Sequence, residues 1–366
     1  DGNSITYDEL QILKNNQQGS EIITNSLARN YKYTKRKLKE NYYKDYYYTV
    51  DDNSVITIKP TFNGHSSGVN SVFVSGDYLF TGSWDTTAKM WDISTGNLKK
   101  TFEGHSIAVL SVFVSNDHLF TGSADSTAKM WDFSTGALVK TFSGHSSWVY
   151  SVFVSGDYLF TGSDDTTAKM WDISTGYLKK TFEGHSSSVY SVFVSGNYLF
   201  TGSYDRTAKM WYADPSSGNF GNLKKTFEGD SSNVYSVFVS GDYLFTGSYD
   251  STAKMWDIST GNEVRTFSGH SRTVNSVFVT GNYLFTGSYD DTVKMWDINA
   301  TANYNGVVDT PMRTLSGHTN NVMSVFVSND HLFTGSEDNT AKMWHIPELM
   351  TFTITNNSGS GGIGSS

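Results

Sequence analysis

The chain has 366 residues, contains no cysteine and carries 36 acidic against 27 basic residues, a net charge of −9. The lack of cysteine excludes disulfides, thiolate metal centres and cysteine nucleophiles, and the acidic balance disfavours nucleic acid and anionic membranes as partners. No apolar run approaches the roughly 18 residues of a transmembrane helix, so we expect no membrane span. We expect a cytoplasmic protein, with processing or secretion left open because the chain begins with Asp1 rather than Met.

Residues 1–52 are predicted to form an extension rich in Asn, Tyr and Lys. Within it, residues 29–44 hold seven Lys or Arg and one acidic residue, with tyrosines between and after them. Such a run could contact a nucleic-acid backbone and stack on bases. We favour a solvated arm, or a contact for an acidic partner, because the rest of the chain is acidic.

From residue 53 to 347 one unit recurs seven times, most often with a period of 40 residues. Each copy contains the segments SVFV, LFTGS and KMW. In the first copy, β-branched and aromatic residues bounded by turn-forming residues predict strands over 69–74, 78–83, 88–93 and 98–102. One small sheet of this kind cannot bury both of its faces, so neighbouring copies must pack on one another.

Most copies contain a Gly-His pair and end on a Trp-Asp pair, as Gly64-His65 and Trp91-Asp92 do in the first. The spacing from the His position to the Trp is 26 residues in all seven. In these features the chain resembles WD40-repeat proteins, and seven repeats imply an all-β fold, a seven-bladed β-propeller. We therefore divide the chain into an N-terminal extension (1–52), the propeller (53–347) and a C-terminal part (348–366) with a β-forming segment and a flexible Ser/Gly tail.

The outer edge of the last blade needs a partner, because open strand edges promote aggregation. Residues 61–64 (TFNG) match residues 101–104 (TFEG) at the end of the first copy. We predict that residues 55–62 pair beside the strand around 340–346, as the ends of WD40 rings usually do. The segment 349–355 (LMTFTIT) is a second candidate for that edge.

The repeated polar residues are His, Ser or Thr, Asp and Trp, in the first copy His65, Ser83 (or Thr81 on the same strand face), Asp85 and Trp91. A Ser-His-Asp catalytic triad is one interpretation, but a set that recurs in nearly every copy argues against an active site. By resemblance to WD40 proteins it is a hydrogen-bonded network within each blade, and we predict no catalytic residue, no metal site and no cofactor. The other residues predicted for this structural network are His105, Asp125, Trp131, His145, Asp165, Trp171, His185, Asp205, Trp211, Asp250, Trp256, His270, Asp290, Trp296, His318, Asp338 and Trp344.

One copy departs from the pattern, because Asp230 stands where the other six have His. Asp250 would then face a second carboxylate, and like charges raise one pKa or attract a cation or water. A special site in that blade is one interpretation. We favour the other, the loss of one network residue among seven copies.

The copies differ most beside the first strand and beside the turn Asp. By resemblance to WD40 rings, these positions face the top surface and the mouth of the central channel, where partners usually bind. Exposed Trp and Tyr are typical of binding hot spots, and drift among duplicated repeats is the alternative. The residues predicted to bind a partner are Trp84, Trp148, Tyr150, Tyr190, Tyr204, Arg206, Tyr235, Tyr249, Arg272, Tyr289 and Met323.

We therefore expect a non-catalytic scaffold or adaptor that binds a protein or peptide partner through an aromatic top face, with no small-molecule substrate. The alternative is a structural subunit that self-assembles through its N-terminal arm and C-terminal tail, as a homo-oligomer or within a larger assembly. The LFTGS and KMW segments resemble the WD40 regions of protist myosin heavy chain kinases in style, although the chain holds no kinase motif. The chain could accordingly be the targeting module of a longer protein.

Overall fold

The computed structural model describes residues 46–50, 56–300, 307–308, 310–346 and 349. The chain divides into two compact units, residues 1–48 and 49–366, and nearly all of the described structure belongs to the second. The basic run 29–44 and most of the C-terminal part 348–366 lie outside the described residues. Where the structure is described, every regular element is a strand, and no helix is long and apolar enough to cross a bilayer.

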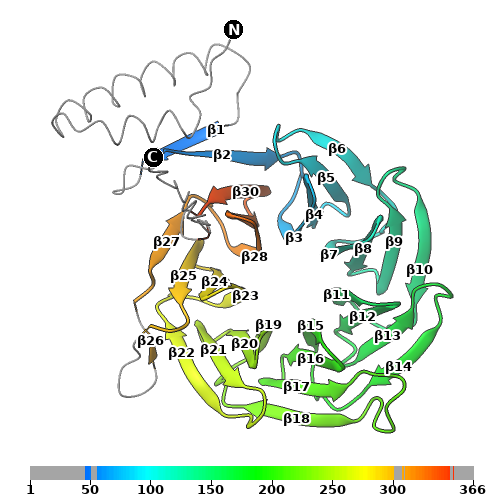
Figure 1. The fold of residues 1–366 in the computed structure, drawn as a ribbon. Helices are drawn as coiled ribbons and strands as arrows, with labels where there is room; N and C mark the ends of the chain where they lie inside the picture. Colours follow the sequence, from blue (N-terminus) through cyan, green and yellow to red (C-terminus); the bar gives the residue numbers. More distant parts are fainter. Residues whose placement is uncertain (1–45, 51–55, 301–306, 309, 347–348, 350–366) are drawn as a thin grey trace, which may run out of the picture. The chain divides into compact units, whose positions relative to one another are not determined.

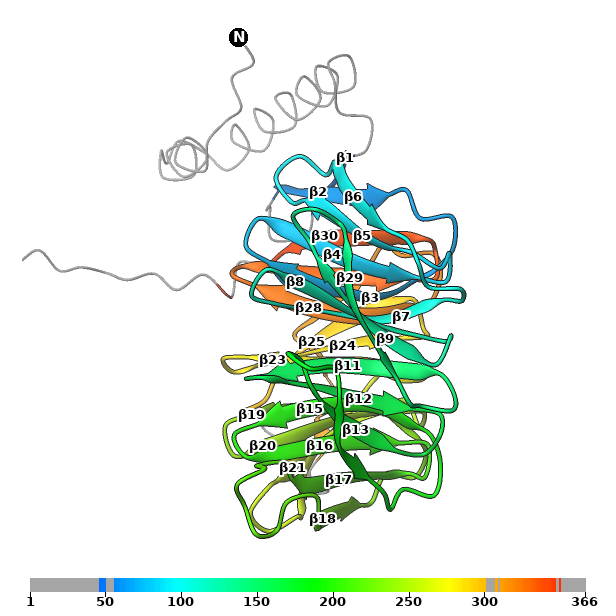
Figure 2. The same cartoon turned by 90° about the vertical axis from the view of Figure 1, so that its right-hand side faces the viewer.

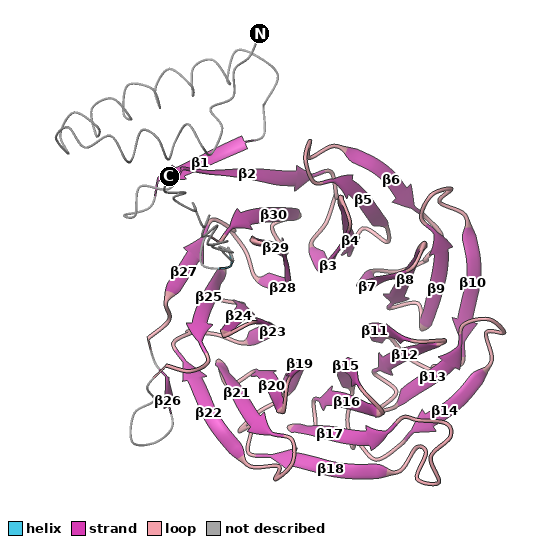
Figure 3. Ribbon diagram, in the orientation of Figure 1, coloured by secondary structure: helices cyan, strands magenta, loops and turns pink. Residues whose placement is uncertain are grey.

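Seven antiparallel sheets surround a central opening like the blades of a propeller (Figure 1). In blades 1 to 6 the chain starts at the centre and moves outward strand by strand, and in blade 7 it does so for the three inner strands (Figure 3). The predicted seven-bladed all-β propeller is confirmed. The strands of blades 1 to 3, from the centre outward, are β3 (Val69–Ser75), β4 (Tyr78–Ser83), β5 (Ala88–Asp92) and β6 (Leu98–Phe102); β7 (Val109–Ser115), β8 (His118–Ser123), β9 (Thr127–Asp132) and β10 (Leu138–Ser143); and β11 (Val149–Ser155), β12 (Tyr158–Ser163), β13 (Ala168–Asp172) and β14 (Leu178–Phe182).

Blades 4 to 7 have the same layout. The long connection between the third and fourth strands of blade 6 adds a short strand, β26 (Val307–Val308), which pairs in parallel with the outer strand of blade 5. β1 (Tyr46–Val50) lies at the boundary of the two units. The strands of blades 4 to 7 are β15 (Val189–Ser195), β16 (Tyr198–Ser203), β17 (Thr207–Tyr212) and β18 (Leu223–Glu228); β19 (Val234–Ser240), β20 (Tyr243–Ser248), β21 (Thr252–Asp257) and β22 (Glu263–Ser268); β23 (Val274–Thr280), β24 (Tyr283–Ser288), β25 (Thr292–Asp297) and β27 (Arg313–Ser316); and β28 (Val322–Ser328), β29 (His331–Ser336), β30 (Thr340–His345) and β2 (Ile56–Asn63).

The ring closes through a strand from the N-terminal side of the propeller. β2 pairs antiparallel with β30, with Thr61 opposite Lys342 and Phe62 opposite Ala341. Phe62 is buried and its ring lies edge-on to that of Trp91, with 6.1 Å between the centroids. The predicted closure is confirmed, and the second candidate, 349–355, lies outside the described residues apart from Leu349.

The hydrophobic core is divided into seven clusters, each between two consecutive blades. Between blades 1 and 2, Phe80 and Met90 of one sheet pack against Val112 and Trp131 of the next. The glycine of each LFTGS segment allows this approach, because a Cβ at Gly82 would lie 2.8 Å from a methyl of Val109 in the next blade. At six further glycines a Cβ would lie 2.9 to 3.0 Å from an atom of the next blade: Gly122, Gly162, Gly202, Gly247, Gly287 and Gly335.

Two closed circles of contacts join the seven innermost strands. The phenylalanines of the SVFV segments contact one another around the channel, with centroids 4.6 to 5.0 Å apart from Phe73 through to Phe326 and back. The serine of each segment accepts a hydrogen bond from the backbone N–H of the next blade, as Ser71 does from Val112 at 3.0 Å. The last of these bonds, from Val72 to Ser324, completes the circle. These contacts fix the blades relative to one another.

The turn between the second and third strands of each blade is held in a strained backbone conformation. Its third residue has a φ of 67 to 72° in all seven blades, and none of these residues is glycine. In blade 3 the residue is Thr166, whose β-branch is poorly suited to the left-handed region. The carboxylate of Asp165 holds the turn by accepting hydrogen bonds from the N–H and hydroxyl of Thr167.

We expect Thr166→Asn to stabilise the protein by up to about 1 kcal/mol, because Asn tolerates the left-handed conformation better than Thr. The measurement is the free energy of unfolding in urea. Blade 7 supplies the reciprocal control, since Asn339 already occupies this position with a φ of 69°. Asn339→Thr should be destabilising by a similar amount, and two changes of the same sign would contradict this explanation.

Candidate functional site

The two faces of the ring are distinguished by their connections. The turns between the first and second strands and between the third and fourth lie on one face, which we call the bottom face. Because neighbouring strands are antiparallel, the other connections, such as β4–β5 and β6–β7, lie on the opposite, top face. Figure 2 views the ring from its edge.

A hydrogen-bonded network connects the four predicted residue types in six blades. In blade 1, the His65 ring nitrogens lie 2.7 Å from a carboxylate oxygen of Asp85 and 2.7 Å from the Thr81 hydroxyl. The indole N–H of Trp91 donates to the same hydroxyl at 2.9 Å. The strand hydroxyl between His and Trp therefore belongs to Thr81, whereas Ser83 accepts the Asp85 N–H at 3.0 Å and donates to a backbone carbonyl. Of the two candidates on this strand face, Thr81 and not Ser83 is the central residue of the network.

The charges in this network follow from burial and hydrogen bonding. Burial lowers the pKa of His145 and outweighs the opposing effect of Asp165, so the imidazole is neutral at pH 7. Burial alone would raise the pKa of Asp165, but hydrogen bonds from His145 and Thr167 outweigh it and hold that pKa well below its ordinary value. Each proton therefore has one acceptor: the indole donates to Thr, Thr donates to Nε2 of His, and Nδ1 of His donates to Asp.

The top face carries a continuous row of aromatic side chains, which we call the aromatic arc. Neighbouring ring centroids in it are 4.4 to 6.1 Å apart, within the range of favourable aromatic contacts. The exposed fractions of Trp84, Trp148 and Tyr204 are 39, 37 and 48%. The arc consists of Trp84, Trp148, Tyr150, Tyr190, Tyr204 and Tyr235.

The arc spans blades 1 to 5 because blade 2 has small residues at the corresponding positions. Trp84 belongs to blade 1 and Trp148 to blade 3, yet their centroids are 6.0 Å apart. Between these blades, Ala108 and Ala124 occupy the positions equivalent to Trp148 and Trp84, and both are buried. The two large rings can therefore meet above blade 2.

The other residues predicted on this face surround the arc without a ring contact to it in the described structure. Tyr249 is exposed and Tyr289 is half-buried. The guanidinium of Arg272 donates to the backbone carbonyl of Tyr289 at 2.8 Å. Arg206 is exposed in the turn of blade 4, and Met323 is half-buried in the innermost strand of blade 7.

The structure adds one residue that the sequence did not single out. Asp164 lies in the β12–β13 turn of blade 3, where its carboxylate accepts hydrogen bonds from Ser147 at 2.8 Å and Ser188 at 2.6 Å. The hydroxyl of Tyr150 lies 3.5 Å from the same carboxylate. The only sequence signal was a carboxylate at a position where three other blades have Tyr.

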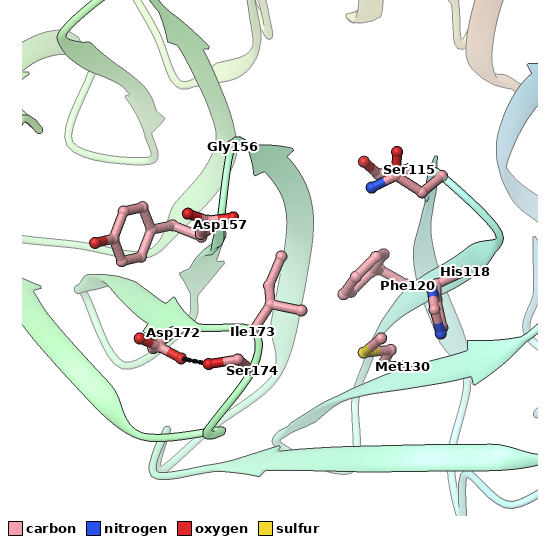
Figure 4. A pocket seen from close by; sticks show the side chains of 11 residues that line it. Ser115, His118, Phe120, Met130, Gly156, Asp157, Asp172, Ile173 and Ser174 are labelled. Atoms are coloured by element: carbon pink, nitrogen blue, oxygen red, sulfur yellow. Dashed lines mark hydrogen bonds between the residues drawn. The ribbon is translucent and has the colours of Figure 1, made fainter.

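A hollow of about 420 Å³ lies on the bottom face between blades 2 and 3 (Figure 4). Blade 2 has His118 where five blades have Tyr, and the equivalent Tyr78 packs against the core between blades 1 and 2. The shorter imidazole therefore leaves this space open. At its edge, Asp172 already bonds Ser174 at 2.7 Å and Lys179 at 3.3 Å. Within the described structure, no group of three or more His, Asp or Glu is placed to hold a metal ion.

The family model described as WD domain, G-beta repeat matches the chain at residues 57–92, 96–132, 136–172, 176–212, 221–257, 261–297 and 309–345. These seven segments cover most of the chain, and each contains the outermost strand of one blade followed by the three inner strands of the next. The chain belongs to the WD40 family. No curated protein sequence matches this WD40 chain.

The propeller is also similar to a solved structure. It aligns with the crystal structure of the computationally designed Ika8 protein with a TM-score of 0.61 and 26% sequence identity. The alignment covers 78% of this chain and 98% of the designed one.

Blade 5 breaks the WD40 network. Asp230, in place of His, accepts a hydrogen bond from the Thr246 hydroxyl at 3.2 Å, and its other carboxylate oxygen is buried without a partner. Asp250 instead accepts from the N–H and hydroxyl of Ser231. Burial, followed by the charge of Asp250, raises the pKa of Asp230 to about 7. This blade therefore holds a carboxyl group that is uncharged below neutral pH.

The raised pKa predicts a pH-dependent stability that Asp230→Asn removes. Asp230 is favourable only when protonated, so its contribution is fully present below pH 3.8 and is lost as the pH rises through about 7. Over that interval we expect the free energy of unfolding of the wild type to fall by up to about 4 kcal/mol relative to that of Asp230→Asn, because each pKa unit corresponds to about 1.4 kcal/mol. The measurement is urea unfolding of both proteins from pH 4 to pH 8.5. Asp77→Asn, on the exposed bottom face, is the control, and parallel curves for wild type and Asp230→Asn would contradict the prediction.

Proposed function

We propose that this protein is a non-catalytic interaction module whose aromatic arc binds a protein or peptide partner. WD40 propellers are in general interaction scaffolds without enzymatic activity. The observation that supports the proposal most is the continuity of the arc, in which six Trp and Tyr rings contact one another on one face. Contiguous exposed aromatic surface is uncommon on proteins unless it serves an interaction, and Trp and Tyr are the usual anchors of binding hot spots.

The differences among the blades support the same function. The network residues recur because they hold each blade together, whereas blade 2 folds with Ala108 and Leu110 where blade 3 has Trp148 and Tyr150. The aromatic residues are therefore not required by the blade itself. The Ser and His side chains that could suggest a catalytic triad are buried and the Asp side chain is 7% exposed in blade 1, and their hydrogen bonds are already used within the network.

The test exchanges the anchors of blade 3 for the residues of blade 2, in the double variant Trp148→Ala with Tyr150→Leu. We expect binding to the partner to weaken at least tenfold, because loss of a hot-spot aromatic costs about 2 kcal/mol or more. We expect Tm to fall by only a few degrees, because each lost ring contact is worth about 0.5 to 1.5 kcal/mol. The partner is identified by quantitative capture from extracts of the producing cells with the wild-type protein as bait.

The matched control is Tyr177→Ala, which removes an aromatic side chain of 75% exposure from the bottom face of the same blade. Blade 2 again has alanine at this position, Ala137. The control should capture the same partner as wild type. Equal capture by the double variant, or a fall in Tm that accounts for its loss of binding, would contradict the proposed function.

A further inference from the structure

Asp164 places a negative charge within the aromatic arc. Its two carboxylate oxygens are bonded by the hydroxyls of Ser147, from its own blade, and Ser188, from blade 4. These bonds fix the carboxylate where the loops of the two blades meet. At the equivalent position the other blades have Trp84, Ala124, Tyr204, Tyr249, Tyr289 and Glu337, so the fold itself does not require an Asp here.

Two rings of the arc lie next to this carboxylate, and a third contacts one of them. The rings of Tyr150 and Tyr190 are 4.4 Å apart at an interplanar angle of 35°, and the indole of Trp148 meets the Tyr150 ring at 6.0 Å. The Tyr150 hydroxyl approaches Asp164 to 3.5 Å. Burial raises the pKa of both tyrosines, and the charge of Asp164 raises both further. The carboxylate is therefore close to both rings, and both hydroxyls stay uncharged.

The charge of Asp164 is not balanced by a cation within the described part of the chain. Asp164 is half-buried, and no Lys, Arg or His of the described residues forms an ion pair with it. The hydrogen bonds that it accepts come from neutral hydroxyls. Arg272, which lies on the same face, donates to the Tyr289 carbonyl instead. A partly buried carboxylate gains most from a charge-assisted bond with a cation.

We propose that Asp164, together with Trp148, Tyr150 and Tyr190, binds a side-chain ammonium or guanidinium group, that is, a Lys or Arg of the partner. This inference rests on the proposed function of the aromatic arc and assigns the chemistry of one contact within it. The carboxylate supplies the charge-assisted hydrogen bond, and the ring faces supply cation–π attraction. A metal ion is disfavoured, since Asp164 stands alone as a carboxylate among hydroxyls and rings, whereas aromatic faces suit an organic cation.

The test uses four small probes on the intact chain labelled with ¹⁵N at the tryptophan indoles. The probes are the N-acetyl amides of arginine, lysine, norleucine and glutamate. We expect the arginine probe, the lysine probe or both to shift the indole signal of Trp148 saturably, with norleucine and glutamate giving at least tenfold weaker binding. The signal is assigned by its loss in Trp148→Ala, and the ratio of the two cationic affinities shows which side chain the site prefers.

Asp164→Asn keeps the size of the side chain and removes its charge. We expect it to weaken binding of the cationic probes at least tenfold without changing Tm, because Ala124 occupies the same position in blade 2. Asp77→Asn removes an exposed carboxylate from the bottom face, where blade 4 already has Asn197. It should bind the probes as wild type does, which separates a local effect from a change in net charge.

Equal binding of the norleucine and cationic probes would overturn the inference, as would unchanged affinity in Asp164→Asn. Either result leaves the proposed function standing if the double variant of Trp148 and Tyr150 still loses its partner. The converse is also distinguishable. If the double variant still captures the partner while Asp164→Asn loses binding of the cationic probes, the proposed function is contradicted. The cation site then exists but does not serve binding of that partner.

Discussion

The structure depends on one buried threonine hydroxyl in each blade. In blade 1, the Thr81 hydroxyl accepts the indole proton of Trp91 and bonds the imidazole of His65, which in turn bonds Asp85. This chain joins the second strand, the third strand, the loop before the first strand and the top-face turn. Since a buried polar group without partners is costly, each member holds the others in place. The position of the top-face turn is a consequence of this chain.

The same bonds hold the top-face turns, and two members of the aromatic arc, Trp84 and Tyr204, lie on such turns. Asp85 holds the turn that carries Trp84, and Asp165 holds the turn that carries Asp164. The backbone of these turns is therefore placed by the core of the blade. A surface built in this way loses little entropy on binding, which favours tight contacts from few residues. The residues beside the turn Asp can change without loss of the fold, as the seven blades show.

The sequence was sufficient where a feature recurs in every copy. The strands of blade 1 end within one residue of their predicted bounds because Gly, Asp and Ser mark the turns, and the match of residues 61–64 with 101–104 predicted the closing strand. It was insufficient where a contact joins different blades. The meeting of Trp84 with Trp148 needs the small residues of blade 2, and the role of Ser71 needs the register between two inner strands. Thr81 and Ser83 lie on one strand face, so the sequence could not show which of the two hydroxyls joins His65 to Trp91. The place of Asp164 in the site follows from the hydrogen bonds that it accepts from Ser147 and Ser188, and the sequence alone does not show these bonds.

The most direct test is the hydrogen exchange of the nine tryptophan indole protons, measured on one ¹⁵N-labelled sample. Seven of these indoles donate to a buried threonine, and two, Trp84 and Trp148, belong to the arc. The account predicts fast exchange for Trp84 and Trp148, slow exchange for six network indoles, and an intermediate rate for Trp256, whose chain of bonds ends at Asp230. Network indoles that exchange as fast as the two of the arc would contradict it, and so would a Trp256 proton as protected as the other six.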